Sequence, residues 1–158
     1  MSAFRRSMVL IATGFGAGYS PIASGTVGSL WGVALAWCIN SRLGTVGQVA
    51  ASVVLVLLAI PVCDVAEKYF QKKDDGRIVA DEFLTFPISL IGLSPTPLVL
   101  VIAFLTNRFF DIVKPPPARG LQKLTGGIGV VIDDVFAALY SLAANHAIVW
   151  MLGKCFAH

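Results

Sequence analysis

Two long apolar stretches constrain this chain more than any other feature of its sequence. Val46–Cys63 and Ile128–Leu152 approach or exceed the roughly 20 mostly apolar residues that a helix needs to cross a bilayer, although the second contains two aspartates. Only 13% of the 158 residues are charged, whereas about a quarter are charged in soluble domains. The two stretches therefore predict spanning helices within a single membrane-embedded domain, residues 1–158.

Three shorter apolar segments are predicted to be spanning or half-spanning helices. They cover Thr26–Ile39, Ile78–Leu93 and Leu98–Thr106, the last extended by Arg108 and Phe110. Prolines that follow the second and third segments prevent a helix from continuing past them. Together the five segments predict an all-α, polytopic membrane protein with about four to five transmembrane or half-spanning helices and cytoplasmic loops. The segments at 78–93 and 98–106 either cross the bilayer or form a re-entrant hairpin.

The distribution of charge predicts the orientation of these segments. If the N-terminus is cytoplasmic and each segment crosses or turns back, ten of the twelve basic residues lie inside and only Arg42 and Lys154 lie outside, as the positive-inside rule requires. All nine acidic residues then lie inside as well, although they were not used to choose the orientation. Basic residues in loops between apolar stretches favour a membrane surface over nucleic acid. The ten are Arg5, Arg6, Lys68, Lys72, Lys73, Arg77, Arg108, Lys114, Arg119 and Lys123.

Two acidic pairs lie within apolar sequence. Asp81-Glu82 and Asp133-Asp134 are flanked mostly by Ile, Val, Ala, Phe and Leu, where an ionised group costs several kcal/mol unless it is paired or ligated. Oxygen ligands favour a hard cation such as Mg²⁺, which commonly bridges carboxylates to a substrate phosphate. The four carboxylates therefore need a positive partner, which is either a bound metal such as Mg²⁺ or a set of cationic side chains.

An ion-pair network is the alternative use for these carboxylates. It would join them to cationic side chains at the membrane interface and would need no metal. Asp74 and Asp75 follow Lys72 and Lys73, and a run of charges of this kind is expected to be solvated. The cations available to the network are Arg77, Arg108, Lys114 and Lys123.

Glycine-rich segments precede the first and last of the predicted spans. Gly14–Gly18 is followed by Ser24-Gly25-Thr26, which opens the first predicted helix, and Thr125–Gly129 precedes the last. Free amides and a hydroxyl at a helix N-terminus form an anion site. A flexible loop with an ordinary helix cap explains the same residues equally well.

Missing nucleophiles narrow the chemistry. The chain has no Cys-x5-Arg and no Asp-x-Asp-x-Thr/Val pattern, and His146 and His158 lie away from the acids, with His146 expected to be a packing residue. Cys38, Cys63 and Cys155 lack zinc-like spacing and are expected to be small apolar side chains, although Cys38 and Cys155 can share the outer side, where a disulfide would join them. The mechanism that remains is metal-assisted hydrolysis, in which water attacks the phosphate and a carboxylate accepts the proton. Attack by an aspartate is the less favoured variant.

Four motifs, in order, resemble those of the phosphatidylglycerophosphatase A family and cover nearly the whole chain. The chain departs from the family pattern at Ser24, where proline is usual, at Thr85, where glycine is favoured, and at Pro116, where an aromatic is common. No departure removes a carboxylate. The motifs are Gly14-x-Gly16-x-Gly18-x-Ser20-Pro21-x3-Gly25-Thr26-x-Gly28, Ile78-Val79-x-Asp81-Glu82-Phe83, Arg108-Phe109-Phe110-Asp111-x2-Lys114-Pro115-x-Pro117 and Gly126-Gly127-x-Gly129-x3-Asp133-Asp134.

The resemblance implies an Mg²⁺-dependent phosphatase of the bacterial inner membrane. Its substrate would be the membrane lipid phosphatidylglycerophosphate, and its products would be phosphatidylglycerol and phosphate. The resemblance also extends to Asp64, Glu67 and Asp74, in the acidic stretch before the Asp-Glu motif. We expect Asp81, Glu82, Asp133 and Asp134 to bind metal, Asp111 and Asp134 to act in catalysis, and Thr26, Arg108 and Lys114 to bind the phosphate.

Two other classes of function use similar residues. A transporter also carries carboxylates within membrane helices, but it requires them at several depths rather than at one end. A phosphotransferase of lipid head groups requires a nucleotide site, of which Asp75-Gly76-Arg77 is only a fragment. A phosphatase needs neither feature.

Overall fold

The computed structural model describes residues 3–121 and 124–155, and both ranges are helical with no strand. The all-α prediction is confirmed for these ranges. Lys123, His158 and the side chain of Cys155 lie outside the description, and so does the disulfide considered for Cys38. The elements are α1 (Ala3–Ala12), η1 (Ala17–Tyr19), α2 (Ser24–Arg42), α3 (Thr45–Phe70), α4 (Ala80–Thr85), η2 (Phe86–Leu90), α5 (Pro97–Val113), α6 (Ala118–Leu121) and α7 (Gly127–Cys155), where η marks a 3-10 helix.

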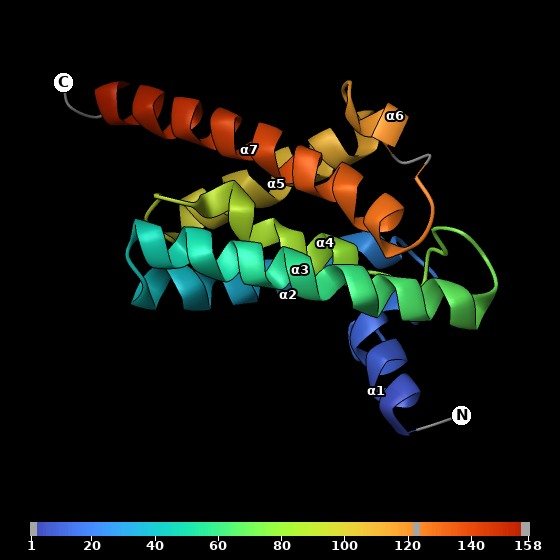
Figure 1. Ribbon diagram of the computed structural model, residues 1–158. Helices are drawn as coiled ribbons and strands as arrows, with labels where there is room; N and C mark the ends of the chain where they lie inside the picture. Colours follow the sequence, from blue (N-terminus) through green and yellow to red (C-terminus); the bar gives the residue numbers. More distant parts are fainter. Residues whose placement is uncertain (1–2, 122–123, 156–158) are drawn as a thin grey trace.

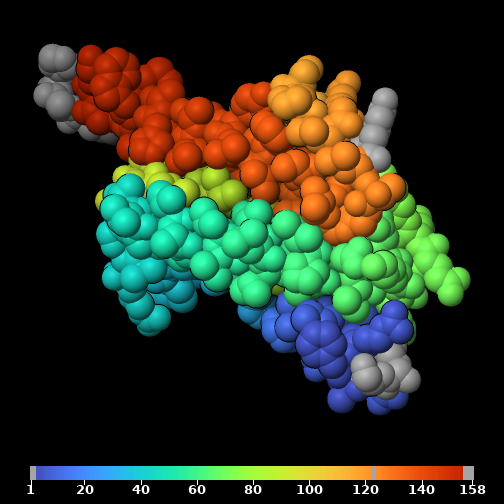
Figure 2. Space-filling model, in the orientation of Figure 1, coloured from blue at the N-terminus to red at the C-terminus, as the bar shows by residue number. Residues whose placement is uncertain are grey.

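The long helices run side by side and alternate in direction (Figure 1). The turn between α2 and α3 and the C-terminal end of α7 lie at one end of the molecule, at the left of Figure 1 and of the space-filling view in Figure 2. The C-terminal end of α3 and the N-terminal end of α7 lie at the other, which we call the acidic end because all nine carboxylates lie toward it. Arg42 and Lys154, the two basic residues predicted to face outward, lie at the opposite end.

Two helices are long and apolar enough to cross a bilayer within the described ranges. They are α3 and α7, and they contain the predicted stretches Val46–Cys63 and Ile128–Leu152. The other three segments form α2, α4 with η2, and α5, so their crossing of a bilayer stays a prediction. The segment 78–93 is not one continuous helix, because it changes from α-helical to 3-10 geometry at Phe86.

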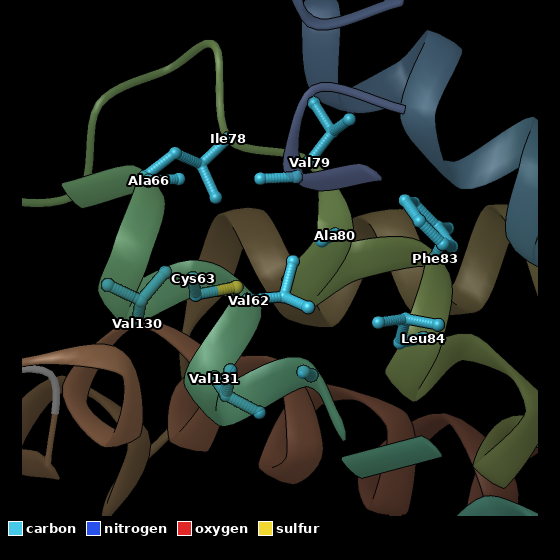
Figure 3. Close-up of a cluster of buried hydrophobic side chains, with 12 residues drawn as sticks. Val62, Cys63, Ala66, Ile78, Val79, Ala80, Phe83, Leu84, Val130 and Val131 are labelled. Carbon is cyan, nitrogen blue, oxygen red and sulfur yellow. The ribbon is translucent and has the colours of Figure 1, made fainter. Parts of the chain in front are cut away.

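A core of small and branched side chains holds α3, α4 and α7 together near the acidic end (Figure 3). Cys63 of α3 is fully buried in this core as a free thiol, which confirms it as a small apolar residue. The start of α7 approaches α3 so closely that a Cβ on Gly127 would lie 1.9 Å from the carbonyl oxygen of Ile60. Glycine at this position therefore fixes the depth at which the next turn of α7, with its two aspartates, enters the bundle.

Polar side chains from three neighbouring helices satisfy the backbone where η2 ends. Asn40, Gln48 and Asn145 bind this irregular stretch from α2, α3 and α7, and His146 of α7 adds a fourth contact, so it is a packing residue as predicted. Backbone groups outside regular helices need such partners in an apolar environment. The bonds run from Asn40 Nδ2 to Leu90 O (2.6 Å), from Gly92 N to Gln48 Oε1 (2.7 Å), from Asn145 Nδ2 to Ser89 O (2.9 Å) and between His146 Nε2 and Ile91 O (2.9 Å).

Replacing Asn145 with leucine is expected to weaken this junction. Asn145 is fully buried and also accepts a hydrogen bond from Thr106 Oγ1 at 2.7 Å. The substitution removes this bond and the bond that the Ser89 carbonyl accepts from Asn145 Nδ2, although Thr106 keeps its contact with Ser141. We expect a loss of about 1–3 kcal/mol of unfolding free energy, measured by denaturation in detergent micelles. The control is Ala147→Leu, on the exposed side of the same helix, which should change stability little. Equal stability of Asn145→Leu and the parent protein would contradict a structural role for these bonds.

Candidate active site

A pocket of about 350 Å³ opens at the acidic end of the bundle. The beginnings of α2, α4 and α7, the end of α5 and the loop between α3 and α4 all contribute to it. It brings together five of the predicted carboxylates and Lys114, from segments that are far apart in the sequence. The lining residues are Ser24, Asp74, Gly76, Ile78, Asp81, Glu82, Asp111, Ile112, Lys114, Asp133 and Asp134.

Local structure explains how α4 presents its acidic pair. Asp81 and Glu82 lie in the first turn, where negative charge is favoured by the free amides of the helix start. The Asp81 carboxylate accepts a hydrogen bond from the Glu82 amide at 3.0 Å. The hydroxyl of Thr85, one turn later and fully buried, donates to the carbonyl of Asp81 at 2.7 Å. Thr85 therefore supports the turn that carries the carboxylates.

Arg108 links the acids of α4 and α5. Its Nη1 lies 3.1 Å from Glu82 Oε2 and 2.9 Å from Asp111 Oδ2, and the Glu82 carboxylate also accepts a hydrogen bond from Ser29 at 3.1 Å. The side chains of Arg108, Glu82 and Asp111, which form these two ion pairs, are largely buried. Glu82 and Asp111 thus form ion pairs with a basic side chain, which is the alternative to metal binding that the sequence left open.

Lys114 links the acids of α5 and α7. It ends α5 in a left-handed conformation, and its ammonium pairs with Asp133 and lies 4.0 Å from Asp111 Oδ1. Burial disfavours the charged lysine, but the hydrogen bond to Asp133 and the surrounding negative charges outweigh burial and raise the pKa of Lys114. Lys114 is therefore held as a cation beside the pocket.

Two carboxylates of the pocket remain without a cation. No ion pair joins Asp81 or Asp134 to a lysine or arginine among residues 3–121 and 124–155, although both side chains are buried. Both carboxylates line the same pocket. The Oδ1 atom of buried Asp133 likewise lacks a hydrogen-bond partner. The pocket thus contains buried oxygen ligands whose negative charge the described side chains do not neutralise.

These residues fit Mg²⁺ by the chemistry of their donor atoms. Six carboxylates line the pocket; Arg108 pairs with Glu82 and Asp111, and Lys114 pairs with Asp133 and lies near Asp111. The described part of the chain contains no group of three His, Cys, Asp or Glu side chains arranged to enclose one ion. Mg²⁺ does not require such a cage, because it usually retains waters and binds through one or two carboxylates plus a substrate phosphate. Asp81, Asp134 and the free oxygen of Asp133 match that requirement.

The loop before α4 differs from the solvated charge run expected from the sequence. Asp75 is buried, and its carboxylate accepts hydrogen bonds from Arg77 Nε at 2.7 Å and Nη2 at 3.0 Å. These bonds lower the pKa of Asp75 to about 2, so the stabilising pair is complete above the usual aspartate pKa and is lost only as the pH falls toward 2. Asp74, in contrast, is exposed and lines the pocket. The expectation of solvation was wrong for Asp75.

Four residues that the sequence had singled out do not line the pocket. Arg108 is one of them, and it lies beside the pocket through its ion pairs with Glu82 and Asp111. Thr26 is half-buried in the first turn of α2 and does not line the pocket, so its binding of phosphate stays a prediction. Asp64 pairs with Lys68 at 2.7 Å, and Glu67 accepts a hydrogen bond from the amide of Asp74 at 3.3 Å. These two carboxylates flank the site instead of lining it.

Glycine residues of the first motif are explained by close packing. A Cβ on Gly18 would lie 2.0 Å from the carbonyl oxygen of Arg77, and one on Gly25 would lie 2.0 Å from Glu82 Oε1. The hydroxyl of Ser24 binds the carbonyl of Gly76 at 2.7 Å instead of capping α2. The motif therefore holds the loop and Glu82 in place, which the sequence alone did not reveal.

Replacing Gly25 with alanine is expected to displace Glu82 from Arg108. The added methyl group cannot fit beside the Glu82 carboxylate, and overpacking of this kind costs about 1–3 kcal/mol. We expect phosphate release to fall about tenfold or more, together with a lower unfolding temperature. Gly153→Ala is the matched control, because nothing lies within 4 Å of its added Cβ. Normal activity in Gly25→Ala would show that the position of Glu82 does not matter.

Comparison with known proteins is consistent with this arrangement. The family model described as phosphatidylglycerophosphatase A matches residues 10–149. The chain is 38% identical to the phosphatidylglycerophosphatase A of Haemophilus influenzae, with 90% of each chain covered, and 36% identical to that of Escherichia coli K12, with 91% of this chain and 86% of the other covered. A Bacteroides thetaiotaomicron protein, provisionally named a phosphatidylinositol-3-phosphatase, is 35% identical over 92% of this chain and 95% of its own. No solved structure matches the chain.

Proposed function

The chain belongs to the phosphatidylglycerophosphatase A family, and we propose on this premise that it hydrolyses the terminal phosphate of phosphatidylglycerophosphate. The products would be phosphatidylglycerol and inorganic phosphate. The observation that carries the proposal is the buried pocket in which Asp81 and Asp134 pair with no lysine or arginine of residues 3–121 and 124–155, while Arg108 and Lys114 lie beside them. Such a pocket suits a phosphomonoester that arrives together with a divalent metal.

A location in the bacterial inner membrane is supported by the surface of α3. This helix has a mean hydropathy of 2.5 in its most apolar window, yet only 28% of that window is buried inside the protein. A soluble protein would not leave such a helix facing water. The orientation is supported by the basic residues, since Arg42 and Lys154 lie at the end opposite the carboxylates. We therefore propose a multi-pass protein whose pocket faces the cytoplasm.

The chain's own side chains would divide the work in the pocket. Asp81, Asp134 and the free Oδ1 of Asp133 would hold Mg²⁺. When bound, Mg²⁺ would offset the charge of the phosphate and lower the pKa of a coordinated water. Asp134 forms no ion pair with the lysines and arginines of the described ranges, so one of its carboxylate oxygens would accept the proton of the attacking water.

Arg108 and Lys114 would bind the phosphate oxygens. Their charges are fixed in position by Glu82, Asp111 and Asp133, which places them beside the pocket before the substrate arrives. Asp111 lies between the two cations and would orient them instead of taking the proton. This assignment differs from the catalytic role expected for Asp111 from the sequence.

The Bacteroides relative defines a second candidate substrate with the same chemistry. Its name specifies phosphatidylinositol 3-phosphate as the substrate, whereas the names of the two other relatives specify phosphatidylglycerophosphate. Purified protein should therefore be given each lipid in detergent micelles with Mg²⁺, and released phosphate should be measured. We expect turnover of phosphatidylglycerophosphate to exceed that of phosphatidylinositol 3-phosphate. Phosphate release from the inositol lipid alone would identify that lipid as the substrate in place of phosphatidylglycerophosphate. Release from neither lipid would refute the proposed phosphatase activity.

A further inference from the structure

We propose that the exposed face of α5 guides one acyl chain of the lipid substrate, with Ile112 as the residue over which the chain leaves the pocket. The inference rests on the proposed function, because it requires a substrate that joins a phosphorylated head group to an apolar chain. It adds a specificity-determining surface outside the carboxylate site.

The rim of the pocket has two chemically different sides. Asp74 and Gly76, on the loop between α3 and α4, are exposed lining residues and form a polar side. Ile112 also lines the pocket and keeps 72% of its surface exposed, although it is a large apolar residue. When the phosphate of an amphipathic substrate lies beside the carboxylates, its acyl chain would extend out of the pocket across the apolar side of the rim.

An apolar stripe continues from Ile112 along α5. The exposed large side chains of this helix recur every three or four residues, which places them on one face. The opposite face, with Val99, Ala103 and Asn107, is buried against the bundle. The stripe consists of Leu98 (57% exposed), Val101 (56%), Leu105 (61%), Phe109 (58%) and Ile112 (72%).

The length of the stripe suits an acyl chain. The stripe extends fourteen positions from Leu98 to Ile112, which corresponds to about 21 Å along a helix. One leaflet contributes about half of the roughly 30 Å hydrocarbon core of a bilayer. A chain that starts at Ile112 would thus lie against the stripe through the depth of one leaflet.

The groups around α5 leave this face open. Phe110 packs on Tyr140 of α7 with ring centroids 5.6 Å apart, and Arg108 turns toward Glu82 of α4. These two contacts occupy the sides of α5 that face its neighbours. Phe109 and Ile112, which alternate with them in the sequence, remain on the outer side.

A second apolar hollow offers a contrasting place for a chain. It has a volume of about 310 Å³, lies between α3, η2 and α7, and includes Val53 and Leu57 in its lining. It shares no lining residue with the acidic pocket, and no residue of α3 lines that pocket. Leu57 is 61% exposed and so provides a matched control for the α5 positions.

The test compares two substrates with the same phosphorylated head group, one with long acyl chains and one with short chains that is soluble as a monomer. Phe109→Ser and Leu105→Ser, which lie on the stripe but do not line the pocket, are expected to raise KM for the long-chain lipid about tenfold while kcat, and all constants for the short-chain substrate, stay near the parent values. Leu57→Ser should change neither substrate. Both α5 side chains are more than half exposed, so their loss should leave the fold intact.

Three results would overturn the inference. Parent-like KM values for the long-chain lipid in both α5 variants would remove the stripe from substrate binding. Equal losses on both substrates would show damage to the pocket itself, and a selective loss in Leu57→Ser would place the chain in the hollow beside α3. Failure of the proposed function is distinguishable, because the parent protein would then release phosphate from neither substrate.

Discussion

Asp134→Asn is expected to reduce phosphate release at least about a hundredfold while leaving the unfolding temperature unchanged or higher. Asp134 is buried in the pocket and pairs with no basic side chain that the structure describes, so its ionised carboxylate raises the energy of the folded protein unless metal is bound. Asparagine has nearly the same shape but no charge, and it neither binds Mg²⁺ as strongly nor accepts a proton. A group retained for function at the expense of stability should show this opposite response of activity and stability.

The control for this variant is Asp64→Asn. Asp64 is also a carboxylate of the acidic end, but it pairs with Lys68 and does not line the pocket. Its substitution should change activity less than about threefold, since exposed ion pairs contribute little. Comparable activity losses in the two variants would mean that the acidic end acts only through its overall charge. Full activity of Asp134→Asn would exclude Asp134 from the site.

Removal of divalent metal is expected to abolish phosphate release, and Mg²⁺ is expected to restore it. The same ion should stabilise the protein, because a ligand at a hundred times its dissociation constant adds about 2.7 kcal/mol to the free energy of unfolding. The unfolding temperature in detergent should therefore rise with Mg²⁺ in the parent protein. Asp81→Asn and Asp134→Asn should lose most of this rise, because each removes a carboxylate that lacks any other cation among the described residues.

The same titration separates metal binding from general screening of charge. Na⁺ at equal ionic strength should not reproduce the stabilisation, and Asp64→Asn should keep the Mg²⁺ response of the parent. Undiminished activity after chelation, with no effect of Mg²⁺ on unfolding, would favour hydrolysis by the side chains alone. In that case the attacking aspartate considered from the sequence would become the leading alternative.

Features determined by local sequence were predicted well. The apolar lengths of α3 and α7 are visible directly in the sequence, and the start of α2 at Ser24 follows from its preceding turn. The gathering of Asp81, Asp111 and Asp133 also followed from a topology in which the chain reverses after every segment. These predictions needed only helix length, charge and alternation of direction.

Features determined by tertiary contact were not predicted. The break between α4 and η2 depends on polar groups from α2, α3 and α7, which no local pattern reveals. No local pattern predicted the short helix α1, which is stabilised because Ala12 packs into the core with Val62 and Ala66 of α3. Burial of Asp75 required its partner Arg77 to fold back onto the ring of Phe70, 3.9 Å away.

The departures from the family pattern have structural uses in this chain. Ser24 binds the loop carbonyl of Gly76, and Thr85 binds the carbonyl of Asp81. The carbonyl of Pro116 accepts a hydrogen bond from Tyr140 at 2.7 Å, which joins the segment after α5 to α7. The side chains of Ser24 and Thr85 thus hold segments that line the pocket. Pro116 contributes through its backbone carbonyl alone.

Direct observation of a metal in the pocket tests the central claim most sharply. Crystals of the protein soaked with Mn²⁺ as a substitute for Mg²⁺ should show an anomalous density peak between Asp81 and Asp134, with water or phosphate completing its coordination. The peak should vanish in Asp134→Asn and persist in Asp64→Asn. A pocket without the peak in an active protein, or a peak elsewhere on the acidic end, would contradict the account.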